Sequence, residues 1–132
     1  MPAMNVFDAT LDRRDSGAVV DIGSFQLPLP QEKLVALGSH IGKPVFFGIR
    51  SEDIHDAHYV PRGVDEAAKL NANVTVVEPL GSEVYAYVAN GGKEMVSRLD
   101  PRTSARVGQP LDLVIDMDKM HAFERDSGRT LL

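Results

Sequence analysis

The stretch of sequence that decides the fold is Val74-Thr75-Val76-Val77-Glu78-Pro79-Leu80-Gly81-Ser82-Glu83-Val84-Tyr85-Ala86-Tyr87-Val88. In its second half, Val84, Ala86 and Val88 alternate with two tyrosines. Such alternation places one side of a strand on a core and leaves the other side more exposed. The Pro-Leu-Gly-Ser segment in the middle consists largely of residues that favour tight turns. We therefore predict two strands joined by a short connection.

A period of two dominates the rest of the chain as well, and turns rich in Gly, Asn, Asp and Ser separate the alternating segments. Strands are predicted near Val6–Leu11, Ala18–Asp21, Phe25–Pro28, Pro44–Ile49, Asn73–Glu78, Glu83–Ala89, Glu94–Arg98, Leu111–Asp116 and His121–Glu124. Many short strands at close spacing indicate a barrel or a sandwich, and closing the sheet removes exposed edges. We predict an all-β fold, an OB-like small β-barrel with one or two short helices.

Helical signals are few. Gln31–Leu37 follows a proline, has leucines on one face and is followed by Gly38, so it is predicted to form a helix. A short helical turn is predicted to start at Ser51, whose hydroxyl would cap it. The polar segment His55–Lys69 is expected to form a long surface loop, with a little helix at Val64–Lys69.

Length and composition restrict the classes of protein to consider. The 132 residues suit one domain spanning 1–132, or two small lobes that share a core. A net charge of −5 and scattered basic residues argue against a nucleic-acid partner. The chain has no cysteine, which excludes disulfides, thiolate zinc sites and cysteine nucleophiles. It also has no apolar run near the roughly 20 residues of a membrane helix and no signal-peptide pattern, so we expect a cytoplasmic protein.

Motifs for catalysis or metal binding are weak. Gly38–Pro44 approaches a phosphate-binding loop, but its glycines are one residue too close and Pro44 offers neither a hydroxyl nor an amide hydrogen. His55, Asp56 and His58 would share a metal only if their segment were helical, and a solvated loop with two unrelated imidazoles is the favoured interpretation. Gly38–Pro44 is interpreted as a turn that enters a strand.

Glu78 and Glu83 flank the Pro-Leu-Gly-Ser turn and could form an acid–base pair across a hairpin. No nucleophile, electrophile or oxyanion donor is marked nearby. We therefore interpret both glutamates as residues that frame the turn, and the sequence gives little support to an enzyme.

Six phrases, in the right order over nearly the whole chain, resemble one family: the C-terminal regulatory (TOBE, OB-type) domain of maltose-type sugar ABC transporter ATP-binding subunits. The phrases are Pro2–Phe7, Leu27–Pro30, Gly48-Ile49-Arg50-Ser51-Glu52-Asp53-Ile54, Glu78-Pro79-Leu80-Gly81-Ser82-Glu83, Val107–Pro110, and His121–Glu124 with Ser127-Gly128. Ser51 stands where the family usually has proline, and Glu124 where it has aspartate. The segment after Ile54 has no counterpart that we can align.

The resemblance implies that the parent protein hydrolyses ATP to drive sugar import. It places the Walker motifs and the signature loop in an ATPase domain, which we expect upstream of Met1. ATP and Mg would bind there, so no cofactor is expected in this chain, and we expect the chain itself to be non-catalytic.

The resemblance also implies a homodimer, docked on membrane-spanning permease subunits at the inner face of the cell membrane. A regulatory protein docks on this domain in some members. Tyr85 and Tyr87 are candidate contact residues because tyrosine is enriched at interfaces. The alternative, that they pack under a loop or across the barrel, remains open. The turn that comprises Glu78, Pro79, Leu80, Gly81, Ser82 and Glu83 is interpreted as a fold signature or part of this interface.

Two other functions are alternatives to a regulatory domain. Related transport-associated OB domains bind oxyanions, for which backbone amides near Gly81 and the hydroxyl of Ser82 would be the donors. The acidic charge disfavours this alternative. An OB-type nucleic-acid binder ranks last, because the chain has 6% aromatic residues, no tryptophan and a negative charge.

Overall fold

The computed structural model describes residues 4–132, so Pro2 and Ala3 of the Pro2–Phe7 phrase lie outside the described residues. The strands are β1 (Asn5–Arg14), β2 (Gly17–Asp21), β3 (Gln26–Pro28), β4 (Pro44–Ile49), β5 (Ile54–Asp56), β6 (Lys69–Pro79), β7 (Val84–Asn90), β8 (Lys93–Leu99), β9 (Pro110–Ile115) and β10 (His121–Glu124). The helical elements are α1 (Gln31–Leu37) and the 3₁₀ helices η1 (Gly38–His40), η2 (Ser51–Asp53) and η3 (Met117–Lys119). The predicted all-β class and the helix at 31–37 are confirmed.

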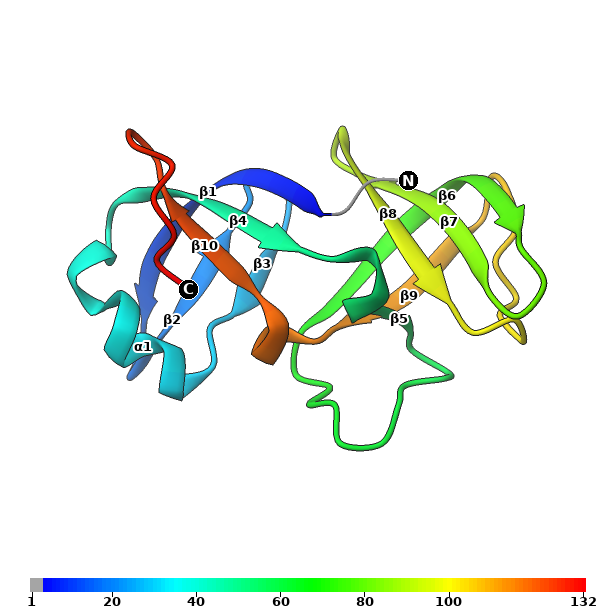
Figure 1. Cartoon of the computed structure of the whole chain (residues 1–132), viewed down its shortest axis with the longest axis horizontal. Helices are drawn as coiled ribbons and strands as arrows, with labels where there is room; N and C mark the ends of the chain where they lie inside the picture. The colour runs from blue at the N-terminus through cyan, green and yellow to red at the C-terminus, as the bar shows by residue number, and fades with distance from the viewer. Residues whose placement is uncertain (1–3) are drawn as a thin grey trace.

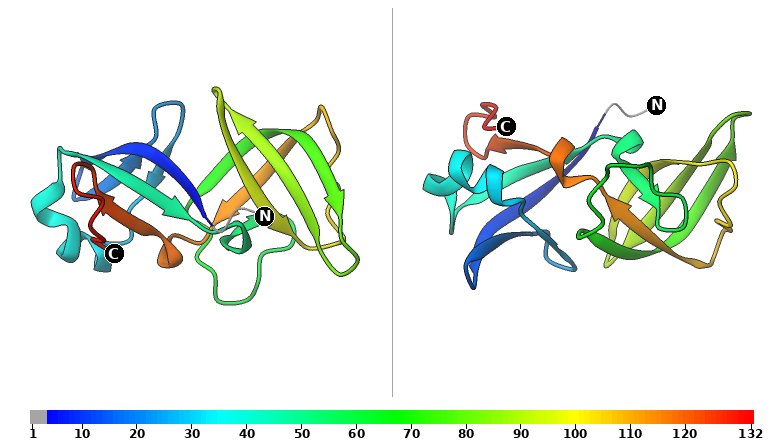
Figure 2. Two further views of the ribbon diagram at one scale, coloured as in Figure 1. Left: turned by 45° about the horizontal axis from the view of Figure 1, so that its top comes forward. Right: turned by 90° about the horizontal axis from the view of Figure 1, so that it is seen from below.

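The strands form two five-stranded sheets, which make two lobes side by side (Figure 1). The first lobe has the order β10-β4-β1-β2-β3 and carries α1, and the second has the order β5-β9-β6-β7-β8. The chain crosses between the lobes twice, through η2 and through η3. Figure 2 shows that each sheet is strongly curled, as expected for an OB-like half-barrel. The edge strands β5 and β8 of the second sheet lie against each other, which reduces its open edge.

The opening stretch of the sequence forms the β6–β7 hairpin. The strands pair antiparallel from Asn73 opposite Ala89 to Pro79 opposite Val84. The backbone N–H of Leu80 donates to the carbonyl of Glu83 at 2.9 Å and closes the turn. Gly81 has a φ of 74°, a conformation that glycine adopts without steric cost. The predicted strand–turn–strand unit is thus confirmed.

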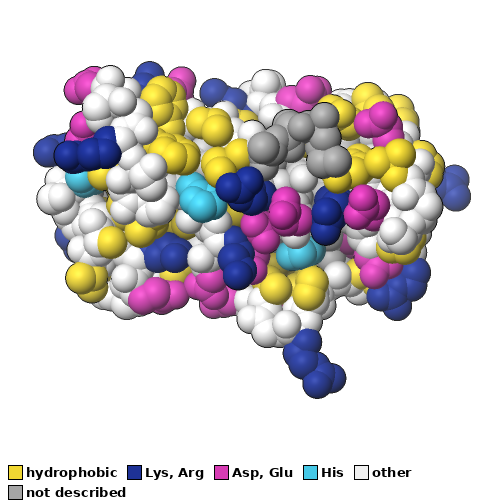
Figure 3. Space-filling model, viewed as in Figure 1, with side chains coloured by type: hydrophobic (Ala, Val, Ile, Leu, Met, Phe, Trp, Pro, Cys, Tyr) yellow, Lys and Arg dark blue, Asp and Glu magenta, His cyan; other side chains and the backbone are white. Residues whose placement is uncertain are grey.

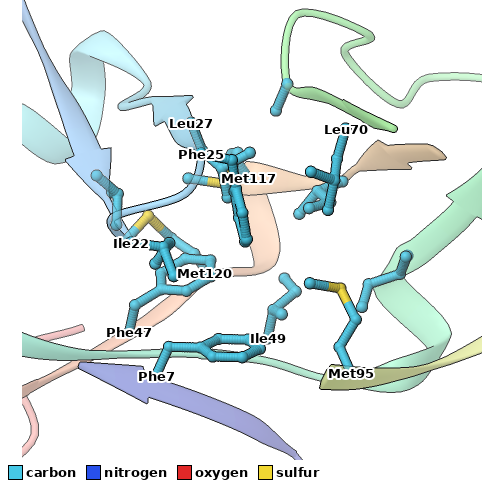
Figure 4. Packing of buried hydrophobic residues seen from close by; sticks show 14 of the residues in the cluster. Phe7, Ile22, Phe25, Leu27, Phe47, Ile49, Leu70, Met95, Met117 and Met120 are labelled. Atoms are coloured by element: carbon cyan, nitrogen blue, oxygen red, sulfur yellow. The ribbon is translucent and has the colours of Figure 1, made fainter. Parts of the chain in front are cut away.

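One cluster of buried apolar residues extends through both lobes. Leu27 and Phe47 contribute from the first sheet, Leu70 and Met95 from the second, and Met117 from the crossover between them (Figure 4). The side chains from the sheets occupy the inward positions of their strands, as the period of two predicts. The two lobes therefore share a core.

Polar contacts also join the lobes. The side-chain Nδ2 of Asn5 donates to the carbonyls of Ile49 at 3.1 Å and Val96 at 3.0 Å. Its Oδ1 accepts from the N–H of Val96 at 2.8 Å, so the Asn5 amide pairs with β8 as a short strand would. A further contact lies at Gly91, where an added Cβ would come 2.3 Å from the Cβ of Ser24. The β7–β8 turn therefore requires glycine for tertiary as well as local reasons.

The structure corrects three expectations in the middle of the chain. Val64–Lys69 forms no helix, because Lys69 starts β6 and the carbonyl of Ala68 accepts from the N–H of Ile115 in β9. His55 lies in a strand, β5, which pairs with β9, and not in the loop. Ser51 lies inside the η2 turn, and Arg50 occupies its N-cap position. In the first two cases pairing with the distant strand β9 decides the local conformation.

Candidate functional site

The six residues of the predicted turn lie at one end of the second lobe. Glu78, Pro79, Leu80, Gly81 and Ser82 are exposed, and Glu83 is half-buried. Oε2 of Glu83 lies 3.2 Å from Nε of Arg98, which belongs to the neighbouring strand β8. The turn is therefore a solvent-exposed tip, held at Glu83 by an ion pair.

The two glutamates have separate partners. Glu83 pairs with Arg98, whereas Glu78 interacts with Tyr87 across the hairpin. The negative charge of Glu78, together with slight burial and a hydrogen bond with Glu78, raises the pKa of Tyr87 above its usual value. Each carboxylate thus has a partner within the second lobe, and their role in framing the turn stays a prediction.

The two tyrosines share the outer face of the sheet but differ in exposure. Tyr85 retains only 4% of its surface and is buried within this chain, whereas Tyr87 is half-buried. For Tyr85 this agrees with the alternative that it packs within the domain. Tyr87 remains a candidate contact residue.

A surface residue that the sequence did not single out is Val76, which is 44% exposed beside Tyr87 in the register of the hairpin. Simple alternation would place Val74 and Val76 on the same face. A bulge between them turns Val74 into the core and Val76 outward, because an extra residue shifts the alternation. Leu80, which is 55% exposed, lies at the tip of the same hairpin.

We call Val76, Leu80 and Tyr87 together the hairpin patch. In the view of Figure 3, hydrophobic side chains reach the surface of both lobes, interspersed with charged ones. Exposed apolar side chains on a rigid hairpin suit contact with another protein surface. Nothing in the hairpin patch resembles a catalytic arrangement.

The coupling between Tyr87 and Glu78 leads to a prediction. We expect the pKa of the Tyr87 phenol to lie above its ordinary value in the native chain, because ionisation would place a second negative charge beside Glu78. Glu78→Gln removes that charge and should shift the pKa of Tyr87 back toward its ordinary value. The titration can be followed by NMR of Tyr87 ring signals. Glu94→Gln, the weaker neighbouring charge, is the control and should have the smaller effect.

The histidine segment forms a structural cluster. The buried carboxylate of Asp56 accepts from the N–H of His58 at 2.9 Å and from the hydroxyl of Thr103 at 2.6 Å. His55 and Asp56 are successive residues of a strand, so their side chains point to opposite faces. Burial lowers the pKa of His55, while the charge of Asp116 opposes the shift. Among residues 4–132 no three His, Cys, Asp or Glu side chains are placed to hold a metal ion.

The segment that approaches a phosphate-binding loop forms the connection into β4. Gly38–His40 is a 3₁₀ turn, and the N–H of Gly42 donates to the carbonyl of Leu11 at 2.6 Å. This agrees with its interpretation as a turn that enters a strand. Within the described part of the chain, no helix is long and apolar enough to cross a membrane.

Comparison with known proteins identifies the class to which this fold belongs. Residues 1–54 match the family model of the MalK OB fold domain, and residues 68–122 match that of the TOBE domain. The chain therefore belongs to the MalK-type OB/TOBE family, as the six phrases of the sequence indicated.

The relatives share this region with the chain almost from end to end. The trehalose/maltose import ATP-binding protein MalK of Thermococcus litoralis is 34% identical over 132 residues, which cover 98% of this chain and 35% of the relative. The oligosaccharides import ATP-binding protein MsmX of Bacillus subtilis is 35% identical over 128 residues, which cover 96% of this chain and 34% of the relative. The ABC transporter ATP-binding protein YcjV of Escherichia coli K12 is 31% identical over 128 residues, which cover 96% of this chain and 33% of the relative. The chain thus spans about a third of the length of these relatives.

A solved structure has a similar fold. The cytoplasmic molybdate-binding protein ModG, crystallised with molybdate bound, superposes with a TM-score of 0.64 and 20% sequence identity. The match covers 92% of this chain and 96% of the ModG chain. At this identity the similarity concerns the fold, and it supports the OB-like architecture.

Proposed function

We propose that this chain is the regulatory and dimerisation region of the ATP-binding subunit of a sugar ABC importer. The observation that carries the proposal is the match, nearly end to end, to the import ATP-binding proteins MalK and MsmX. The chain matches the MalK OB fold and TOBE family models, and we expect it to hydrolyse no ATP itself. In the proposed assembly the ATPase domain of the same parent chain binds ATP and Mg. The parent acts in the cytoplasm as a homodimer on the permease subunits.

The hairpin patch is the surface that we propose for self-association. A two-fold interface needs a self-complementary patch that keeps its shape, and the patch lies on a paired and closed hairpin. Its centre is apolar, through Val76 and Tyr87, whereas Glu78, Glu83 and Arg98 provide charges of both signs around it. A regulatory protein would use the remaining surface of the domain.

The test measures self-association of the 132-residue chain by sedimentation equilibrium. We expect a concentration-dependent dimer, which Leu80→Asp weakens about tenfold or more because it places a charge in an apolar contact. Val35→Asp is the matched control. It introduces the same charge at an apolar side chain that is 88% exposed on α1, away from the hairpin, and should leave the dimer unchanged.

Two results would contradict the proposal. A chain that stays monomeric up to millimolar concentration would remove the dimerisation role. Equal weakening by Leu80→Asp and Val35→Asp would place the interface elsewhere.

The second candidate function is oxyanion binding, favoured by the fold similarity to ModG. The backbone amides near Gly81 and the Ser82 hydroxyl would be donors, but Glu78 and Glu83 place negative charge beside them. Calorimetric titration with molybdate, tungstate and sulfate distinguishes the two functions. Binding that Ser82→Ala weakens would support the second candidate, and a flat trace would exclude it.

A further inference from the structure

A small pocket lies where the two lobes meet, away from the hairpin patch. Its walls come from three separate segments: the β3–α1 connection at Pro28-Leu29-Pro30, the end of the long loop at Asp65, Ala67 and Ala68, and the crossover at Ile115, Met117 and Asp118. Because each lobe and the crossover contribute, the pocket exists only in the assembled fold. No single motif in the sequence marks it.

The pocket is apolar in its interior. Leu29, Ala68, Ile115 and Met117 are all buried residues of the shared core. Its volume is about 190 Å³, below the roughly 300 Å³ at which pockets begin to enclose a drug-sized molecule. The pocket therefore has room for one extended side chain or a fragment of similar size.

The rim of the pocket is acidic. Asp65 and Asp118 both line it and are exposed at its mouth. One oxygen of Asp65 already accepts from the N–H of Ala67 at 2.9 Å. Glu32 lies beside Asp118, and their hydrogen bond, with smaller contributions from burial and charge, raises the pKa of Asp118. The positive charge of Lys33 lowers the pKa of Asp118 and so opposes these effects. Carboxylates nevertheless predominate around the mouth of the pocket.

An apolar interior with an acidic rim fits an aliphatic chain that ends in a cation. Arginine and lysine both bury their methylene groups against apolar surface while the charged end stays in water. Arginine fits this rim better, because a planar guanidinium presents several donors to carboxylates and is less strongly hydrated than an ammonium group.

We propose that this pocket receives an arginine side chain of a partner protein. The methylene groups would lie on Leu29 and Met117, and the guanidinium would meet Asp65 and Asp118. This inference is independent of the proposed dimer, because the hairpin patch contributes no residue to the pocket.

The test uses the 132-residue chain and Nα-acetyl-arginine amide as the probe, followed by two-dimensional ¹H–¹⁵N NMR. We expect saturable shifts at Ala67, Ala68, Met117 and Asp118, with a dissociation constant in the millimolar range, near −4 kcal/mol. The neutral analogue Nα-acetyl-citrulline amide has nearly the same shape and should cause little change. Asp65→Asn and Asp118→Asn should each weaken binding about two- to fivefold, as expected for an exposed ion pair.

Asp126→Asn is the matched control, since it removes one exposed carboxylate that does not line the pocket. The same spectra show whether each variant remains folded. Equal shifts with the citrulline analogue, or equal binding by Asp65→Asn, Asp118→Asn and Asp126→Asn, would refute recognition of the cation. The absence of any saturable shift would refute the pocket as a binding site.

Discussion

Phe47→Ala is expected to lower the free energy of unfolding by about 3–5 kcal/mol. Phe47 lies in β4, retains 1% of its surface and belongs to the core cluster that the two lobes share. Truncation removes the apolar ring from the core and leaves a cavity that the paired strands on both sides cannot readily fill. Urea denaturation followed by far-ultraviolet circular dichroism measures the loss.

The adjacent residue provides the control for this prediction. Phe46 points to the opposite face of β4, is half-buried and has the guanidinium carbon of Arg125 5.1 Å from its ring centre. Phe46→Ala should lower the free energy of unfolding by about 1 kcal/mol, which is the scale of an exposed cation–π contact. Comparable losses for the two variants would mean that β4 does not present Phe47 to the core. If Phe47→Ala fails to fold, Phe47→Leu offers a smaller truncation for the same comparison.

Asp56→Ala is expected to lower the free energy of unfolding by about 2–3 kcal/mol, because it removes a buried carboxylate that accepts two hydrogen bonds. Asp56 is 1% exposed and receives hydrogen bonds from Thr103 and from the backbone of His58. Loss of the carboxylate would leave the Thr103 hydroxyl without this partner and would release the turn that follows β5. Hydrogen exchange of the His58 amide should then increase along with the drop in the urea midpoint.

Two further variants separate this role from metal binding or a histidine function. The side chain of His58 is 73% exposed, so His58→Ala should change stability within about 0.5 kcal/mol. Asp112→Asn alters an exposed carboxylate on the neighbouring strand β9 and should be similarly mild. A large loss in His58→Ala with a small one in Asp56→Ala would contradict the acceptor role of Asp56.

Most of the strands could be predicted from the sequence, because one face of each strand packs on a core and this imposes a period of two. The β6–β7 hairpin and the Asn90-Gly91-Gly92 turn are clear examples, since local alternation and turn residues agree there. The segment from His55 to Lys69 was predicted less well. Its first residues become β5 through pairing with β9, a partner more than fifty residues away in the chain, and no local signal records that pairing.

The candidate site likewise combines features that the sequence predicts with features that depend on tertiary contacts. The sequence identified the turn from Glu78 to Glu83 and the tyrosines beside it. It could not show that Tyr85 is buried, which depends on tertiary packing. Nor could it show that Val76 is exposed, because a bulge in β6 shifts the alternation there. The pocket at the lobe junction was missed entirely, since its residues come from three distant segments.

The sequence by itself determined the all-β class, the positions of most strands and turns, and the family, because these depend on short-range alternation and on ordered phrases. Only the tertiary structure decided how the two curled sheets share one core. It also decided how Asn5 joins them and which outward side chains form the hairpin patch. The physical reason is that long-range strand pairing and close packing bring together residues whose separation along the chain carries no local signal.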